Sequence, residues 1–219
     1  MSGKCKSLWS GFITSFFLRV LRASVVQFSS SIARRPTMPI NSPDSAPVTI
    51  RFATADDIAI VWRLIGELAE YEKLADQMIA TPEQLRTMLF GPRTSADVLL
   101  AELNHEPVGY AICFTNYSTF LGRTGLYLED LFVRGAVRGQ GIGRRLLAAV
   151  AKLAQDRGCG RLEWSALDWN SRAIEFYQNL GAQLRREWLG FRLAGTKLDE
   201  LAAEGIALEP PDSAPRGNR

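Results

Sequence analysis

Residues 138–145 read RGQGIGRR, a combination of glycines and cations that could bind phosphate. The glycines fall where an apolar-periodic segment, residues 142–157, predicts the start of a helix. Backbone N–H groups at a helix start lack intrahelical partners, and glycines let an anion reach them without meeting a Cβ. We interpret the stretch as a pyrophosphate cradle, with a purely structural turn as the alternative. Its residues are Arg138, Gly139, Gln140, Gly141, Ile142, Gly143 and Arg144.

Two adjacent carboxylates interrupt an apolar segment just before this stretch. Residues 127–133 read YLEDLFV, a strand pattern in which Glu129 and Asp130 point to opposite faces. At least one carboxylate therefore faces a region that would otherwise be buried, which is costly unless the charge is paired or hydrogen-bonded. We predict that Glu129 faces a cleft beside the glycine stretch. For Asp130 we favour the plainer interpretation, a loop cap or an ion pair with an arginine.

Two helical segments carry further side chains that suit a ligand. Asn170 begins the segment NSRAIEFYQNLGA, and Tyr177 follows two helical turns later, so both project from nearly the same face. Tyr71 and Glu72 stand at the end of an earlier helical segment, where an aromatic ring beside a carboxylate suits a cationic ligand. An N-cap, a core tyrosine and a solvated helix end are the plain alternatives.

Capping and periodicity signals predict the elements that position these residues. Thr54 and Thr81 are predicted N-caps of helices that end near residues 71 and 90. Asn104-His105 predicts a hairpin turn. Strands alternating with helices after a hairpin predict an α/β (α+β) sheet with helices on both faces. The expected strands are 48–53, 97–103, 107–114, 125–133 and 161–167, with one or two more in 185–194, and the later helices are 142–157 and 170–182.

Composition narrows the classes of function. Three cysteines without a CxxC spacing and a single histidine offer no set of metal ligands, so we expect no metal, and reduced thiols in the cytoplasm. The net charge of +3 arises in residues 1–43, which contain several lysines and arginines and no acid, so it is no argument for nucleic acid. The apolar run at residues 8–21 is too short to span a membrane.

The chain divides into three expected parts. Residues 1–46 form a basic, Ser/Pro-rich N-terminal extension, residues 47–205 one globular domain, and residues 206–219 a C-terminal tail. We expect both ends to be disordered. We interpret the extension as dispensable, with Met38 as the working start. A mitochondrial targeting segment and a surface-binding helix are the alternatives.

Together these motifs resemble the GNAT superfamily of acetyl-CoA-dependent N-acetyltransferases over about residues 47–200. Residues 138–143 are similar to the family pattern R/Q-x-x-G-x-G/A. The segments LAEYEKLADQ, YSTFLGRTGLYLEDLFV and LDWNSRAIEFYQNLGA are similar to the diamine acetyltransferase branch, which includes polyamine (spermidine/spermine) and thialysine enzymes. The resemblance implies a GNAT fold, with a mixed, mostly antiparallel sheet of six to seven strands flanked by helices on both faces, and a homodimer.

The resemblance also implies roles for single residues. Glu129 matches the position that removes the proton of the amine, through water, and Tyr177 the position that protonates the leaving thiolate. The expected acetyl-CoA contacts are Leu131, Phe132, Val133, Arg138, Gly139, Gln140, Gly141, Ile142, Gly143, Arg144, Asn170, Ala173 and Tyr177. The expected contacts of the acceptor are Tyr71, Glu72, Glu129, Ser118 and Glu187.

One departure from the family pattern concerns the acceptor. Spermidine-type enzymes carry an aspartate where Ser118 stands, and losing that carboxylate removes an anchor for a second ammonium group. Phe120 stands where the relatives have tryptophan. The resemblance therefore favours a small cationic amine: thialysine, a lysine-like or ornithine-like amino acid, or a short diamine. We expect no nucleic-acid or membrane partner.

Three other functions stay open as alternatives. A protein N-terminal or lysine acetyltransferase would need an open groove, whereas residues 114–125 resemble a wall over a small pocket. A catalytically silent acetyl-CoA-binding regulator would need neither Glu129 nor Tyr177. A nucleotide-binding module would need Lys-Ser/Thr after the last glycine, where Arg144 and Arg145 stand.

Overall fold

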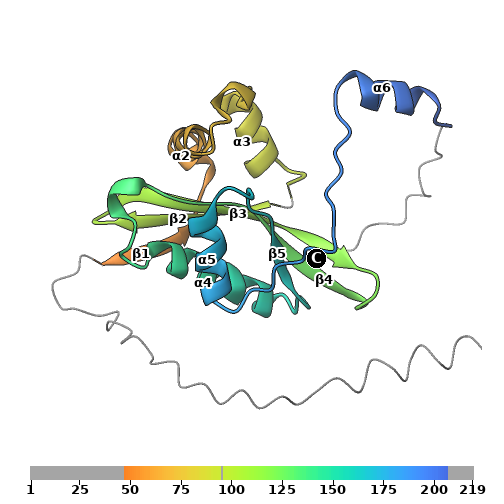
Figure 1. The fold of residues 1–219 in the computed structure, drawn as a ribbon. Coiled ribbons are helices and arrows are strands. Elements are labelled where there is room, and N and C mark those ends of the chain that lie inside the picture. The colour runs from red at the N-terminus through yellow and green to blue at the C-terminus, as the bar shows by residue number, and fades with distance from the viewer. Residues whose placement is uncertain (1–46, 95, 207–219) are drawn as a thin grey trace, which may run out of the picture. The chain divides into compact units, whose positions relative to one another are not determined.

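A computed structural model describes residues 47–94 and 96–206 (Figure 1). The expectations for residues 1–46 and for the tail beyond residue 206 lie outside the described residues. The strands are β1 (Val48–Phe52), β2 (Ala96–Leu103), β3 (Glu106–Ser118), β4 (Arg123–Val133) and β5 (Leu162–Trp164). The helices are α2 (Ile58–Tyr71), α3 (Pro82–Phe90), α4 (Ile142–Asp156), α5 (Ser171–Asn179) and α6 (Thr196–Ala203).

The strands form a single mixed sheet in the order β1-β2-β3-β4-β5. The first four are antiparallel to their neighbours, and β5 pairs parallel with β4. The predicted hairpin is confirmed: β2 and β3 are joined at Asn104 and His105, whose φ values are 53° and 65°. Two successive positive φ angles match the twist of the flanking strands, and asparagine tolerates this conformation well.

Helices cover both faces of the sheet, as the sequence predicts, because the strand side chains alternate between two cores (Figure 1). Leu100 and Tyr110 pack with α2 and α3, whereas Leu99 and Ala111 pack with α4. Residues of α5 also pack against the core on the α4 side of the sheet. No helix in the described ranges is long and apolar enough to cross a membrane.

Local capping fixes where the first helices begin. The backbone N–H and hydroxyl of Thr54 both donate to Asp57, at 2.8 and 3.1 Å, and Asp57 also accepts from Arg51. A short 3-10 turn, residues 55–57, therefore precedes α2. Thr81 and Gln84 form the predicted capping box of α3, with the Thr81 hydroxyl accepting from the Gln84 N–H at 3.3 Å.

A β-bulge interrupts β4 where the two acids stand. Ile112 lies opposite Asp130 and Cys113 opposite Leu128, so Glu129 is the extra residue of the bulged strand. The pairing of β4 with β5 ends at Leu128. Beyond this point no strand among the described residues pairs with that edge of β4. The bulge therefore separates a paired half of β4 from a half whose edge faces the pocket described below.

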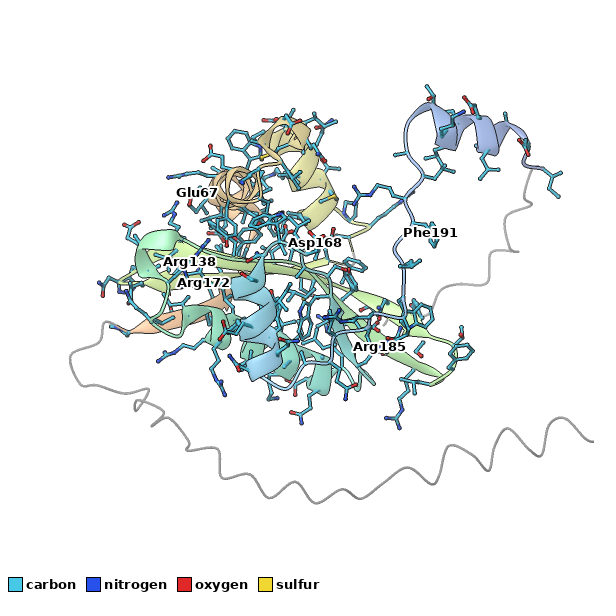
Figure 2. The ribbon with its side chains drawn as sticks, viewed as in Figure 1. Glu67, Arg138, Asp168, Arg172, Arg185 and Phe191 are labelled. Atoms are coloured by element: carbon cyan, nitrogen blue, oxygen red, sulfur yellow. The ribbon has the colours of Figure 1, made fainter. Side chains whose placement is uncertain are left out.

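The expected strand count is wrong, because the described residues contain five strands rather than six to seven. Residues 185–194 form no strand and are exposed, as is the whole segment 183–206, which we call the C-terminal arm. A strand needs a free edge to pair with, and the arm pairs with none in the described chain. Figure 2 shows Arg185 and Phe191 on this arm, which ends in the unexpected helix α6.

Candidate active site

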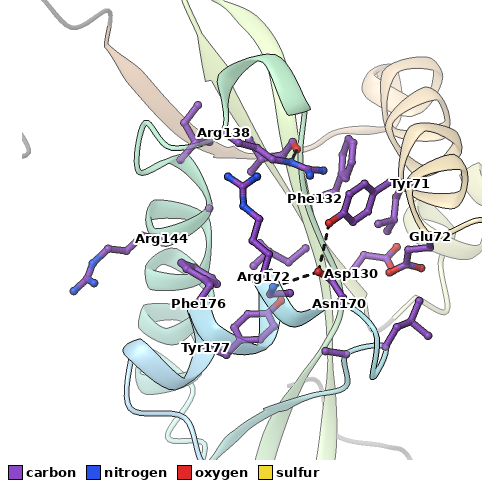
Figure 3. Close-up of a pocket in the computed structure, with 18 of the residues that line it drawn as sticks. Tyr71, Glu72, Asp130, Phe132, Arg138, Arg144, Asn170, Arg172, Phe176 and Tyr177 are labelled. Carbon is purple, nitrogen blue, oxygen red and sulfur yellow. Dashed lines mark hydrogen bonds between the residues drawn. The ribbon is translucent and has the colours of Figure 1, made fainter.

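A cavity of about 490 Å³ collects most of the predicted site residues (Figure 3). It lies between the end of β4, the start of α4, the start of α5 and the end of α2. The predicted residues that line it are Tyr71, Glu72, Glu129, Leu131, Phe132, Val133, Arg138, Gly139, Gly141, Ile142, Gly143, Arg144, Asn170, Ala173 and Tyr177.

Three predicted site residues are not part of this lining. Gln140 is exposed on the glycine loop itself. Ser118 is buried at the far end of β3, where its hydroxyl accepts a hydrogen bond from the Leu121 N–H at 3.2 Å. Glu187 lies on the exposed C-terminal arm, and a hydrogen bond from its own backbone N–H, followed by its contact with Arg185, lowers the pKa of its carboxyl. Their roles toward a ligand stay predictions.

The glycine loop has the geometry that an anion needs. Gly139 and Gly141 have φ values of 87° and 78°, a region that favours glycine, and a Cβ on either would point into open space. Gly141 is the N-cap of α4, and it provides no side chain to satisfy the first N–H groups of the helix. The first intrahelical bond runs from Arg145 N–H to Gly141 O. The preceding donors therefore fit the pyrophosphate of coenzyme A.

Arg138 connects the loop to the acceptor side of the pocket. Its Nε donates to Val133 O at 2.7 Å, and its guanidinium carbon lies 4.2 Å from the centroid of the Tyr71 ring. The Tyr71 hydroxyl in turn donates to Asn170 Oδ1 at 3.4 Å, and the same oxygen accepts the Ala173 N–H at 3.2 Å. Tyr71 therefore already holds a cation of its own chain and braces α2 against the start of α5.

The bulge brings both acids of β4 into the pocket lining. Glu129 is exposed, whereas Asp130 is partly buried and accepts a hydrogen bond from the Tyr110 hydroxyl at 3.1 Å. Burial, together with the negative charges of Glu129 and Glu72, raises the pKa of Asp130 to about 6, while the Tyr110 bond opposes the rise. The favoured interpretation of Asp130 as an arginine partner or loop cap is wrong, because its hydrogen-bond partner is a buried tyrosine.

Two further ionisable groups lie beside this acidic pair. Burial raises the pKa of the Glu72 carboxyl. Burial and the charge of Glu72 raise the pKa of Tyr177 to about 12, so its phenol keeps its proton at neutral pH. The Tyr177 ring packs 5.0 Å from Trp164 and 5.2 Å from Phe176, centroid to centroid. A fixed, protonated phenol at this place can act as a general acid.

The two ends of the pocket differ in charge. Figure 3 shows Arg138 and Arg172 on the side of the glycine loop, and Glu72 and Asp130 on the side of α2 and β4. The first side suits the phosphates of coenzyme A, and the second suits an ammonium group. Within residues 47–94 and 96–206, no group of three His, Cys, Asp or Glu side chains could hold a metal ion.

Sequence reasoning missed Arg172 and underrated Asp130. One sequence feature could have identified Arg172. It places a positive charge in the first turn of a helix, where the macrodipole favours acidic side chains. Alternation along a strand gives no warning of the bulge that turns both Glu129 and Asp130 toward one pocket.

Comparisons with known proteins agree with this geometry. The Acetyltransferase (GNAT) family matches residues 62–182. Thialysine N-epsilon-acetyltransferase of Bos taurus is 43% identical over 168 residues, which cover 72% of this chain and 98% of that protein. L-ornithine N5-acetyltransferase of Arabidopsis thaliana is 32% identical over 212 residues and covers 75% of this chain and 93% of its own length.

The solved structures confirm the fold. An integron cassette protein from the mobile metagenome of V. cholerae superposes with a TM-score of 0.62 at 28% identity, covering 71% of this chain and 97% of that one. The expected α/β GNAT fold is therefore confirmed, with the strand count corrected as above. The chain belongs to the Acetyltransferase (GNAT) family, and it is an acetyl-CoA-dependent N-acetyltransferase of the diamine and thialysine branch.

Proposed function

We propose that the chain transfers the acetyl group of acetyl-CoA directly to the primary amine of a small cationic acceptor: thialysine, a lysine-like or ornithine-like amino acid, or a short diamine. The observation that carries this proposal is the acidic side of the pocket, where Glu72, Glu129 and Asp130 face the same cavity. Three carboxylates gathered in one small cavity favour a cationic guest. The names of the thialysine and ornithine relatives support the same class of acceptor.

The residues present fit acetyl-CoA, which supplies the acyl thioester when bound. The glycine loop and the start of α4 would hold the pyrophosphate through backbone N–H groups. The unpaired edge of β4, from Leu131 to Val133, would pair with the amide groups of the pantetheine arm, and Asn170 lies across the pocket from it. The bulge at Glu129 would direct that arm toward the acids.

The amine must lose a proton before it can attack, because its ordinary pKa is about 10.4. The ammonium proton passes through water to the acidic pair of Glu129 and Asp130. The amine nitrogen then forms a bond to the acyl carbon, and the carbon–sulfur bond breaks. Tyr177 gives its phenolic proton to the departing thiolate, the nitrogen of the new amide loses its second proton to solvent, and the phenol is reprotonated from solvent. No covalent acyl-enzyme is formed.

The two acids differ in role because they differ in exposure. Asp130 is partly buried and has a pKa of about 6, close to the value that suits a general base at neutral pH. Glu129 is exposed on the bulge, so it connects the pair to solvent. Asp130 therefore shares the role that the sequence assigned to Glu129 alone.

Two variants test this catalytic proposal. Glu129→Gln and Asp130→Asn each keep the shape of the side chain while removing the charge. Both should lower kcat by ~10²-fold or more, which is the usual contribution of a general base, with the Kd for CoA close to that of the unchanged chain. An unchanged kcat in both variants would remove the acidic pair from the mechanism.

We also propose that the chain works in the cytoplasm as a homodimer, without nucleic-acid or membrane partners. The support for a dimer is the C-terminal arm, which exposes large apolar side chains that a second copy could cover. They are Leu184, Trp188, Leu189, Phe191, Leu193, Leu198, Leu201 and Ile206. Light scattering on the purified chain should give twice the monomer mass, and a monomer at micromolar concentration would refute the dimer.

Ser118 also belongs to this proposal. It stands where spermidine-type enzymes carry an aspartate, and the absence of that carboxylate disfavours long polyamines.

A further inference from the structure

Arg172 breaks a local rule of helix formation. It stands in the first turn of α5, two residues after the N-cap Asn170, and no acidic residue shares that turn. A cation near a helix N-terminus faces the positive end of the macrodipole, which is unfavourable unless something compensates. Arg172 is exposed and, within the described ranges, makes no hydrogen bond and no ion pair, yet it lines the pocket. An exposed guanidinium without a protein partner, placed on the pocket lining, is free to bind an anionic ligand.

The other two arginines of the pocket are less well placed to supply that contact. Arg138 is committed through its Nε to Val133 O and lies over the rings of Tyr71 and Phe132. In Figure 3 the side chain of Arg144 points away from the cavity, whereas Arg172 points into it on the side of Arg138. Arg172 is therefore the cation that faces the glycine loop from across the pocket.

We propose that Arg172 binds the diphosphate of acetyl-CoA from the side opposite the glycine loop. The loop would then bind the diphosphate through backbone N–H groups on α4, and Arg172 would close the contact from α5. Arginine suits this role because its planar guanidinium can donate two parallel hydrogen bonds to phosphate oxygens. The inference goes beyond the residues that the glycine motif identifies, since it assigns a phosphate contact to the helix that also carries Tyr177.

A contact between Arg172 and the diphosphate predicts which fragments of CoA should lose affinity when Arg172 is replaced. Arg172→Gln should weaken binding of CoA by ~10-fold or more, since a hydrogen bond to a charged group contributes ~1.5–3 kcal/mol. Dephospho-CoA, which lacks the 3′-phosphate but keeps the diphosphate, should lose the same factor. Pantetheine, which has no phosphate at all, should bind both proteins equally. The dependence of CoA affinity on salt should also become shallower in the variant.

Titration calorimetry of the full chain with CoA, dephospho-CoA and pantetheine tests this inference without any acceptor. Arg172→Lys should restore part of the lost affinity, and Arg63→Gln, an exposed arginine of α2 outside the pocket, should change nothing. An equal loss for CoA and dephospho-CoA supports the proposal. A loss for CoA alone would assign Arg172 to the 3′-phosphate, and an equal loss for pantetheine would indicate a structural role; either result, or no loss, overturns it.

Discussion

The hydroxyl of Tyr110 offers a sensitive test of the acidic pair. Tyr110→Phe removes one oxygen from a side chain that is fully buried and otherwise packed against Phe132, so the core keeps its shape. The lost hydrogen bond, 3.1 Å long, is the interaction that lowers the pKa of Asp130 against the opposing effects of burial and neighbouring charge. The variant should therefore raise the pKa of Asp130 above its present value of about 6.

The size of the shift follows from the energy of that bond. A hydrogen bond to a charged group contributes ~1.5–3 kcal/mol, and one pKa unit corresponds to about 1.36 kcal/mol, so the pKa should rise by roughly one to two units. The deprotonated, active form of Asp130 dominates above its pKa. At pH 7 the active fraction, and with it kcat/KM, should fall ~2- to 10-fold, whereas above pH 9 the two proteins should be equal.

The assay is thiol release from acetyl-CoA across pH 5 to 10. The ratio of variant to unchanged kcat/KM cancels the titration of the amine itself. A ratio that rises from acid to alkaline pH and levels at one supports the mechanism. A ratio that is constant with pH would show that Tyr110 has no influence on the catalytic proton, and the role of Asp130 would fall with it.

Three further predictions address other parts of the account. Tyr177→Phe should lower kcat ~10²-fold with little change in the Kd for CoA, and equal rates would exclude Tyr177 as the acid. Gly141→Ala forces a Cβ into a left-handed conformation at φ 78°, which costs ~1–2 kcal/mol. It should weaken CoA binding in calorimetry, and unchanged affinity would contradict the cradle. Leu146→Ala, at a fully buried position of α4, should lower the free energy of unfolding by ~2–5 kcal/mol in urea denaturation.

Local signals in the sequence predict local structure well. The capping pairs at Thr54 and Thr81 and the turn at Asn104-His105 depend on residues within a few positions of each other, and the structure confirms all three. The glycine loop belongs to the same class, because positive φ values and a bare helix start follow from the glycines themselves.

Features that depend on distant partners are not visible in the same way. The bulge at Glu129 exists only in the pairing of β4 with β3, so strand alternation gives Asp130 the wrong environment. The apolar residues of 185–194 suggest strands, but no edge in the described chain accepts them. Arg172 looks like an ordinary surface cation until the pocket and its lack of a partner in the described residues are known.

The measurement that tests the central claim most directly is thiol release from acetyl-CoA with a panel of amines. The panel comprises thialysine, lysine, ornithine, putrescine, spermidine and a peptide with a free N-terminus. The account predicts turnover with small cationic amines, and a higher kcat/KM for the amino-acid side-chain amines than for spermidine or the peptide. Turnover with the peptide alone, or tight CoA binding without turnover of any amine, would contradict the proposed acceptor class.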